Sequence, residues 1–171
     1  FPFFKLYLIF NPLLQLNFLF KSKKNVSHHY DLSDKLYDLF LDKNRQYSCA
    51  YFEKQDNTLE QAQVNKMTRL ASKLHLNNSD KVLDIGCGWG GLGRFFVENH
   101  DCSLKGISLS TEQINYCEKM KTTFSKSSKL EYALQDYRKE KGKFSKIISV
   151  GMFEHVGKPF FKTFFSKIND L

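Results

Sequence analysis

The second half of the chain alternates between two patterns of apolar positions. Short apolar runs predict strands, and apolar positions at helical spacing predict helices. The segments are strands at 82–85, 103–107, 130–133 and 146–150, and helices at 91–99, 111–124 and 159–169. Strands that alternate with helices are typical of a parallel sheet covered by helices on both faces. We therefore expect an α/β fold whose ligand site lies at the carboxyl ends of the strands.

The region before residue 77 has a helical pattern instead. Ser33 is a candidate N-cap for a helix that runs to about Leu41. Residues 42–57 show no regular period. Thr58, with Gln61 three residues later, forms a capping-box pattern at the start of a helix that continues to about residue 74.

Residues 1–20 are rich in Phe and Leu, but Pro12 and several polar residues interrupt the run. A membrane-spanning helix needs about 20 consecutive apolar residues, so the segment is not predicted to span a membrane. Two interpretations stay open. The segment is either an amphipathic element on a membrane surface or a part of the chain that packs against the rest of the domain.

The segment 82–91 holds the strongest sign of chemistry, and it reads Val-Leu-Asp-Ile-Gly-Cys-Gly-Trp-Gly-Gly. A short buried strand is followed by four glycines and then by the start of a helix. Glycine permits positive φ and close approach of a ligand to the backbone, and the N-terminus of a helix attracts polar ligand groups. The succession predicts a nucleotide-type cofactor site.

Two details favour S-adenosylmethionine over a dinucleotide as the cofactor. Asp84 stands just before the glycines, where a carboxylate suits an ammonium or sulfonium group better than a pyrophosphate. The next strand ends in Ser108-Leu109-Ser110, where a dinucleotide fold needs an acidic residue for the ribose. We therefore expect residues 77–171 to form an incomplete Rossmann-like methyltransferase sheet. Residues 1–76 are expected to form a hydrophobic segment and a helical cap over the cofactor site.

Charge adds one open question. The 171 residues carry a net charge of +8, and residues 119–146 hold nine of the Lys and Arg side chains. Such a segment is either a solvated face or a surface for anionic lipid or nucleic acid.

The four cysteines indicate neither a metal site nor a disulfide framework. They form no C-x-x-C pair and have no histidine at ligand spacing, so no metal is predicted. Scattered single cysteines fit a reducing, cytoplasmic compartment.

Several segments between about residues 28 and 160 resemble the cyclopropane-fatty-acyl-phospholipid synthase family of S-adenosylmethionine-dependent methyltransferases. The glycine loop is shared by many methyltransferases, whereas the runs at 47–52 (Tyr-Ser-Cys-Ala-Tyr-Phe) and 151–157 (Gly-Met-Phe-Glu-His-Val-Gly) are far more specific. The other matching segments are 29–31, 58–63, 106–113 and 135–138. The resemblance implies that the chain is the N-terminal half of such an enzyme and is inactive by itself.

The resemblance also implies a reaction. Family members transfer a methylene from S-adenosylmethionine to the cis double bond of an unsaturated phospholipid acyl chain, and a bound bicarbonate takes the proton that is lost as the cyclopropane ring closes. Catalytic roles fall on Cys49 and Glu154, which match two of the residues that hold the bicarbonate. The matching His and Tyr are expected beyond Leu171, and His155 is expected to be structural.

The resemblance further implies a set of cofactor contacts. Ser108 and Gln113 are expected near the ribose, and Tyr137 and Arg138 near the adenine. The full set is Tyr47, Ser48, Asp84, Gly86, Cys87, Gly88, Trp89, Gly90, Ser108, Leu109, Ser110, Gln113, Tyr137 and Arg138.

The expected partner is an unsaturated phospholipid at the membrane surface, which places the protein in the cytoplasm, peripheral at the inner face of the membrane. A homodimer is a further candidate assembly, and no nucleic acid is expected. Two alternatives stay open. One is a related methyltransferase with another lipid or an amine as its acceptor. The other is a membrane- or RNA-binding module that uses the basic segment 119–146.

Overall fold

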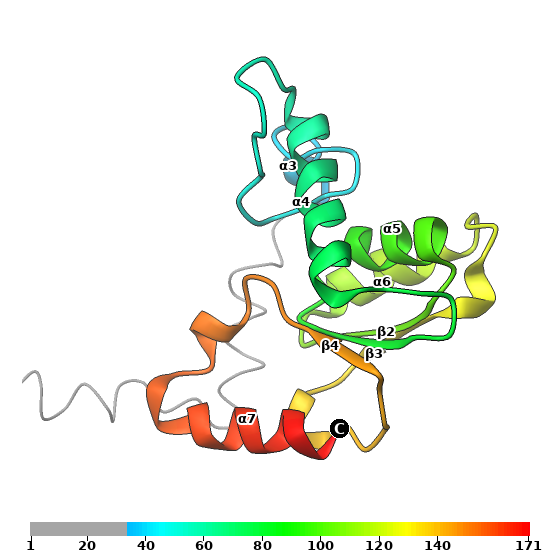
Figure 1. Ribbon diagram of the computed structural model, residues 1–171. Coiled ribbons are helices and arrows are strands. Elements are labelled where there is room, and N and C mark those ends of the chain that lie inside the picture. Colours follow the sequence, from blue (N-terminus) through cyan, green and yellow to red (C-terminus); the bar gives the residue numbers. More distant parts are fainter. Residues whose placement is uncertain (1–33) are drawn as a thin grey trace, which may run out of the picture.

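The computed structural model describes residues 34–171 and shows the expected α/β fold (Figure 1). Its sheet has four parallel strands in the order β3-β2-β1-β4. The strands are β1 (Lys81–Ile85), β2 (Ser103–Ser108), β3 (Leu130–Leu134) and β4 (Lys146–Ile148). The strand order reverses at β1, because β2 and β3 lie on one side of β1 and β4 lies on the other. Doubly wound sheets bind their ligands at such a switch point.

Helices cover both faces of the sheet because successive strand side chains point to opposite sides. Helices α4 (Leu59–Leu74), α5 (Gly91–His100) and α6 (Thr111–Lys121) lie on one face, and α7 (Phe161–Asp170) lies on the other (Figure 1). Val82 packs in the core under the first three helices, and its neighbour Leu83 packs in the core that includes Phe164 of α7. Burial on both faces explains why the strands read as continuous apolar runs.

The helix predicted from Ser33 to Leu41 is wrong in its extent. Helix α3 spans only Asp34–Tyr37, and the backbone then turns. Leu39, which the helical pattern would bury, is 81% exposed. The turn brings Asp38 to Arg45, whose Nε and Nη2 donate to Asp38 Oδ1 at 2.9 and 2.6 Å. The Asp38–Arg45 ion pair accompanies this turn, and the local helical period does not continue through it.

Smaller differences concern the ends of elements. Helix α6 stops at Lys121 rather than near 124, since the hydroxyls of Thr122 and Thr123 bond to backbone carbonyls of the last turn. Strand β4 ends at Ile148, and helix α7 starts at Phe161 instead of 159 because a short 3₁₀ turn with Pro159 precedes it. The remaining 3₁₀ turns are Ser127–Lys129, Tyr137–Lys139 and Phe153–His155.

The capping box of α4 is confirmed. Thr58 Oγ1 accepts from the Gln61 amide at 3.3 Å, and Gln61 Oε1 accepts from the Thr58 amide at 2.8 Å. Within residues 34–171 no helix is both long and apolar enough to cross a membrane. The expectations for residues 1–20 lie outside the described residues.

Candidate cofactor and catalytic site

The glycine loop that follows β1 is packed against its neighbours except at Gly88, where the backbone faces open space. The amides of Gly86 and Cys87 both donate to the Ile107 carbonyl, at 2.9 and 3.1 Å, and so fix the loop to the end of β2. Gly88 has a φ of +54°, and a Cβ added there would meet no atom within 4 Å. The loop thus presents bare backbone to a space large enough for a ligand group.

Asp84 lies beneath this loop as a buried carboxyl with an unpaired oxygen. Its side chain is 2% exposed, and Oδ2 has no hydrogen-bond partner. Burial raises the pKa of this carboxyl to about 7. A buried acid without a partner costs free energy, and a ligand that carries a positive charge would offset that cost. The residues therefore fit a cofactor with cationic groups, such as S-adenosylmethionine.

Trp89 belongs to the junction between the loop and the cap. Its ring lies 4.8 Å from the ring of Tyr37 and 5.3 Å from that of Tyr116, with the Arg45 guanidinium 5.0 Å away. The side chain is 2% exposed, and its Nε1 has no partner. The structure thus packs the indole between Tyr37 and Tyr116, so that a contact between Trp89 and the cofactor stays a prediction.

The polar residues after β2 bond chiefly to one another. Ser108 Oγ donates to Gln113 Oε1 at 2.8 Å, and Ser110 Oγ caps α6 by accepting from the Gln113 amide at 3.3 Å. Both Ser110 and Gln113 are buried, whereas Leu109 is partly exposed. The predicted ribose contacts are brought together at the carboxyl end of β2, in a preformed hydrogen-bonded group.

Tyr137 and Arg138 follow β3, at the same edge of the sheet. The Tyr137 ring is buried against Phe164 of α7 at 5.1 Å. Arg138 makes a two-pronged ion pair with Asp136, at 2.8 and 2.6 Å. The predicted adenine contact therefore concerns side chains that already have protein partners.

The structure brings Ser48, the residue before Cys49, and Glu154 close to the same glycine, Gly151, although about a hundred residues separate them in the sequence. A Cβ on Gly151 would lie 3.8 Å from the Ser48 Cβ and 4.0 Å from Glu154 Oε1, so the residue before Cys49 and the Glu154 carboxylate both border Gly151. A Cβ on Gly86 would clash with Met152 at 2.6 Å, so the same segment touches the glycine loop. Both Cys49 and Glu154 are exposed.

Two functional candidates were missed by sequence reasoning. Gln63 and Lys66 are buried polar side chains of α4, and both reach the segment around Ser48. Their signal in the sequence is a glutamine and a lysine at positions where the helical period of α4 calls for apolar residues.

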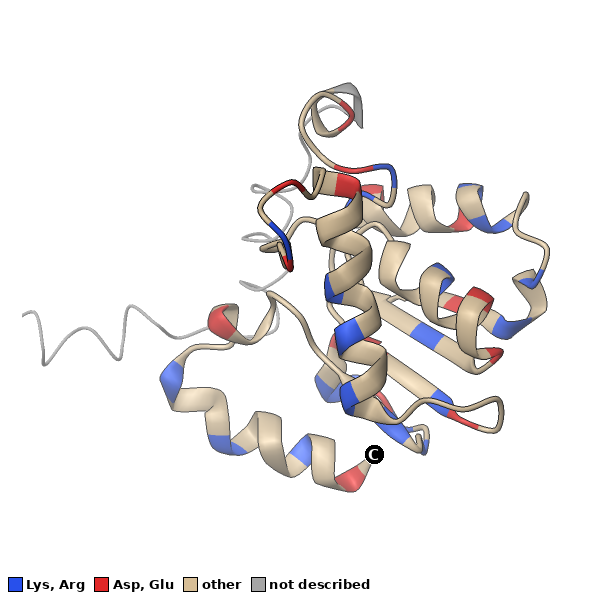
Figure 2. Cartoon of the chain, turned by 45° about the horizontal axis from the view of Figure 1, so that its top comes forward, with Lys and Arg blue, Asp and Glu red and all other residues tan. Residues whose placement is uncertain are grey.

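Several basic side chains of the segment 119–146 form ion pairs or hydrogen bonds within the protein. Lys126 and Lys129 bind Asp101, Arg138 binds Asp136, and Lys143 Nζ donates to the Asp170 carbonyl at 2.5 Å. Figure 2 shows acidic positions interspersed with the basic ones along the described chain. These pairs favour a solvated structural face over a nucleic-acid surface.

Comparison with known proteins assigns the family. A family model described as mycolic acid cyclopropane synthetase matches residues 19–171. The chain belongs to this family. The resemblance found in the motifs at 47–52 and 151–157 is thereby confirmed, and so is the Rossmann-like methyltransferase fold.

Curated relatives from this family are similar over most of the chain. A probable fatty acid methyltransferase of Pseudomonas putida is 47% identical over 134 residues, which are 77% of this chain and 34% of that protein. The cyclopropane-fatty-acyl-phospholipid synthase of Escherichia coli K12 is 42% identical over 156 residues, 89% of this chain and 40% of that protein. The chain thus spans less than half the length of these two relatives.

Solved structures of cyclopropane synthases share the fold. The cyclopropane synthase MmaA2 from Mycobacterium tuberculosis superposes with a TM-score of 0.84 at 35% identity, covering 86% of this chain and 52% of that one. The mycolic acid cyclopropane synthase CmaA1, complexed with SAH and CTAB, has a TM-score of 0.83 at 37% identity with the same coverage. A coclaurine N-methyltransferase, at 18% identity and a TM-score of 0.75, is similar in fold alone.

Proposed function

We propose that the protein transfers a methylene from S-adenosylmethionine to the cis double bond of an unsaturated phospholipid acyl chain and forms a cyclopropane ring. The observation that carries the proposal is that Ser48, next to Cys49, and Glu154 both border Gly151, while Met152 of the same segment borders Gly86 of the glycine loop. A relative at 42% identity is a cyclopropane-fatty-acyl-phospholipid synthase, which supports the choice of a phospholipid.

In this reaction S-adenosylmethionine supplies an electrophilic methyl group. Asp84, with its unpaired oxygen, would face the cationic end of the cofactor, and the bare backbone at Gly88 would admit it. The alkene would form a bond to the methyl carbon as the bond from that carbon to sulfur breaks, and S-adenosylhomocysteine would leave. Closure of the ring requires the loss of one proton, so the acyl chain gains the mass of one methylene in total.

The proton that leaves needs an acceptor close to a developing positive charge. We assign to Cys49 and Glu154 the holding of a bicarbonate ion, which supplies that acceptor when bound. The Glu154 carboxylate also places a negative charge beside the reacting carbons, where a preorganised charge stabilises a cation strongly. Phe52, exposed near Cys49, provides an aromatic face that attracts cations, whereas the ring of Tyr51 already lies against the Arg69 guanidinium.

The proposal is tested with the complete protein, S-adenosylmethionine labelled in its methyl group, and vesicles of an unsaturated phosphatidylglycerol. We expect each modified acyl chain to gain one labelled methylene, to lose its alkene protons and to show cyclopropane protons in the NMR spectrum. A methyl branch, or label transfer to an amine only, would assign the protein to another methyltransferase class. No label transfer to lipid would refute the proposal.

The role of Glu154 is tested separately. Glu154→Gln should lower turnover by about 100-fold or more while leaving the affinity for S-adenosylmethionine within about twofold. The matched control is Glu98→Gln on the surface of α5, which should behave as the wild type. The bicarbonate assignment further predicts that buffer freed of carbon dioxide slows turnover and that added bicarbonate restores it.

A further inference from the structure

Helix α4 buries two polar side chains one turn apart among apolar neighbours. Gln63 and Lys66 lie between Ala62 and Met67, which are both fully buried, and Lys66 is only 8% exposed. A lysine is seldom buried to this degree unless it has a partner. The positions would suit apolar residues if packing were their sole task.

Both side chains reach the same short segment, residues 46–48. Gln63 Nε2 donates to the carbonyls of Gln46 and Ser48, at 3.2 and 3.0 Å. Lys66 Nζ donates to Ser48 Oγ at 2.8 Å. Three hydrogen bonds from α4 thus converge on the residues that directly precede Cys49.

Lys66 also places a charge beside this segment. Burial lowers the pKa of its ammonium group to about 8, while Asp42 and Cys49, the titratable groups that face it, act in the opposite direction. An ammonium group loses favourable hydration when it is buried, and an apolar side chain of similar volume would avoid that cost. Packing stability by itself therefore gives a weak reason for a lysine at this position.

We propose that Lys66 is a positioning residue whose ammonium group, together with Gln63, holds Ser48 and Cys49 at the carboxyl edge of the sheet in the geometry that the reaction needs. The inference rests on the proposed function for what Ser48 and Cys49 do. It adds a residue that touches neither substrate nor cofactor but sets the place of two residues that do.

The test compares Lys66→Met with Lys73→Met, an exposed lysine two turns further along α4, in the complete protein. Lys66→Met should lower kcat by about tenfold or more, since small misplacements of reacting groups are costly, and should leave KM for lipid within about twofold. The variant avoids the desolvation cost of the ammonium group but leaves Ser48 Oγ without its donor, so its Tm should stay within a few degrees of that of the wild type. Lys73→Met should match the wild type in all three. A kcat within twofold of the wild type, or a kcat loss that merely follows a lowered Tm, would overturn the proposal.

The dependence on pH gives a readout that a purely structural lysine would not change. A charge-assisted hydrogen bond is stronger than a neutral one, so the wild-type kcat should fall as pH rises through about 8. Lys66→Met should lack this fall.

Ser48→Ala removes the acceptor of the hydrogen bond from Lys66, and it provides a second test if Lys66→Met does not fold. It should also lack the fall in kcat above pH 8, and adding Lys66→Met to it should cost little more. Retention of the fall in Ser48→Ala, or full additivity of the two changes, would contradict the coupling of Lys66 to Ser48.

A measurement without substrate separates this inference from the proposed function. Backbone amides of residues 46–50 should exchange hydrogen at least about tenfold faster in Lys66→Met than in the wild type or in Lys73→Met. If the wild type makes no cyclopropane product but this exchange difference is found, only the proposed function fails. If product forms and the exchange and kcat of Lys66→Met are unchanged, only the role of Lys66 fails.

Discussion

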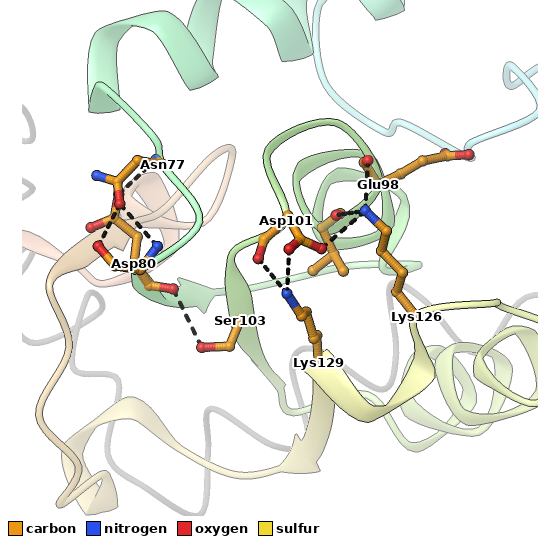
Figure 3. A network of polar contacts seen from close by, with 9 residues as sticks. Asn77, Asp80, Glu98, Asp101, Ser103, Lys126 and Lys129 are labelled. Atoms are coloured by element: carbon orange, nitrogen blue, oxygen red, sulfur yellow. Dashed lines mark hydrogen bonds and ion pairs between the residues drawn. The ribbon is translucent and has the colours of Figure 1, made fainter.

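The amino and carboxyl edges of the sheet differ in how completely their polar groups are paired. At the amino edge, Asp80 accepts from the Asn77 amide at 2.9 Å, and Asp101 binds Lys126 and Lys129 at 3.0 and 2.7 Å (Figure 3). Asp80 also accepts from Ser145 Oγ at 2.7 Å. Within residues 34–171, the buried side-chain atoms that lack a partner are Gln63 Oε1, Asp84 Oδ2 and Trp89 Nε1. Asp84 lies near the carboxyl end of β1, Trp89 lies in the loop that follows it, and Gln63 lies on α4 beside the segment 46–48.

This difference separates stability from function. The polar groups of the amino edge are paired with one another and hold the ends of β1 and β2 together, so they do not need a ligand as a partner. Unpaired buried groups are costly in free energy, and proteins keep them chiefly where a ligand or a reaction needs them. The contrast predicts that changes at the carboxyl edge alter binding, whereas changes at the amino edge alter stability.

The largest effect on binding is expected at Gly88. A valine there would fill the open space above the loop and would be strained at a φ of +54°. We expect Gly88→Val to weaken S-adenosylmethionine binding by about 100-fold or more, roughly 2.7 kcal/mol, as measured by calorimetry. Gly88→Ala shares the strain but adds less volume, so its loss should be about tenfold or less. Equal losses in the two variants would mean that strain, rather than occupation of the cofactor space, is responsible.

Asp84→Asn should weaken binding by about 10- to 100-fold, or roughly 1.4–2.8 kcal/mol, because it removes the charge that faces the cofactor. It should also change the pH dependence of stability. The folded pKa of Asp84, about 7, lies above the value of about 3.9 in an unfolded chain. The unfolding free energy of the cofactor-free wild type should therefore fall as pH rises from about 4 to 7, and Asp84→Asn should lack this component. Denaturant titrations over that pH range measure it, and parallel curves for the two proteins would contradict it.

At the amino edge, Asp80→Ala should cost about 1–3 kcal/mol of unfolding free energy, since it leaves the Asn77 amide and Ser145 without their acceptor. Binding of S-adenosylmethionine should stay within about twofold of the wild type. A binding loss comparable to that of Asp84→Asn would erase the distinction between the two edges.

The smallest effect is expected for Asp101→Asn. Its ion pairs with Lys126 and Lys129 are partly exposed, and such pairs contribute little and are screened by salt. A slight decrease in Tm at low salt should disappear at high salt. A large decrease that persists at high salt would show that this network does more than surface pairing.

Local patterns predicted much of the fold. The apolar runs around Val82 and Ile107 and the capping box at Thr58 depend on neighbouring residues, and the elements they predict are present. The extent of α3 could not be predicted this way, because its apolar period continues to Leu41 although the backbone turns after Tyr37.

The candidate site was predictable where a motif carries it. The glycines and Asp84 form one contiguous run, and the runs around Cys49 and Glu154 indicated the family. The burial of Trp89 under Tyr37 and the hold of Lys66 on Ser48 depend on tertiary packing, which periodicity does not encode. A lysine on the inner side of α4 was the one trace of the latter in the sequence.

The measurement that tests the account most directly is proton release on cofactor binding. Calorimetry of S-adenosylmethionine binding at about pH 6.5, in two buffers that differ in ionisation enthalpy, gives the number of protons released. If the unpaired Asp84 carboxyl meets the cationic end of the cofactor, binding should release a substantial fraction of one proton from the wild type and none from Asp84→Asn. Equal proton release from both proteins, or no release from the wild type, would contradict the assignment of the cofactor site to the carboxyl edge of the sheet.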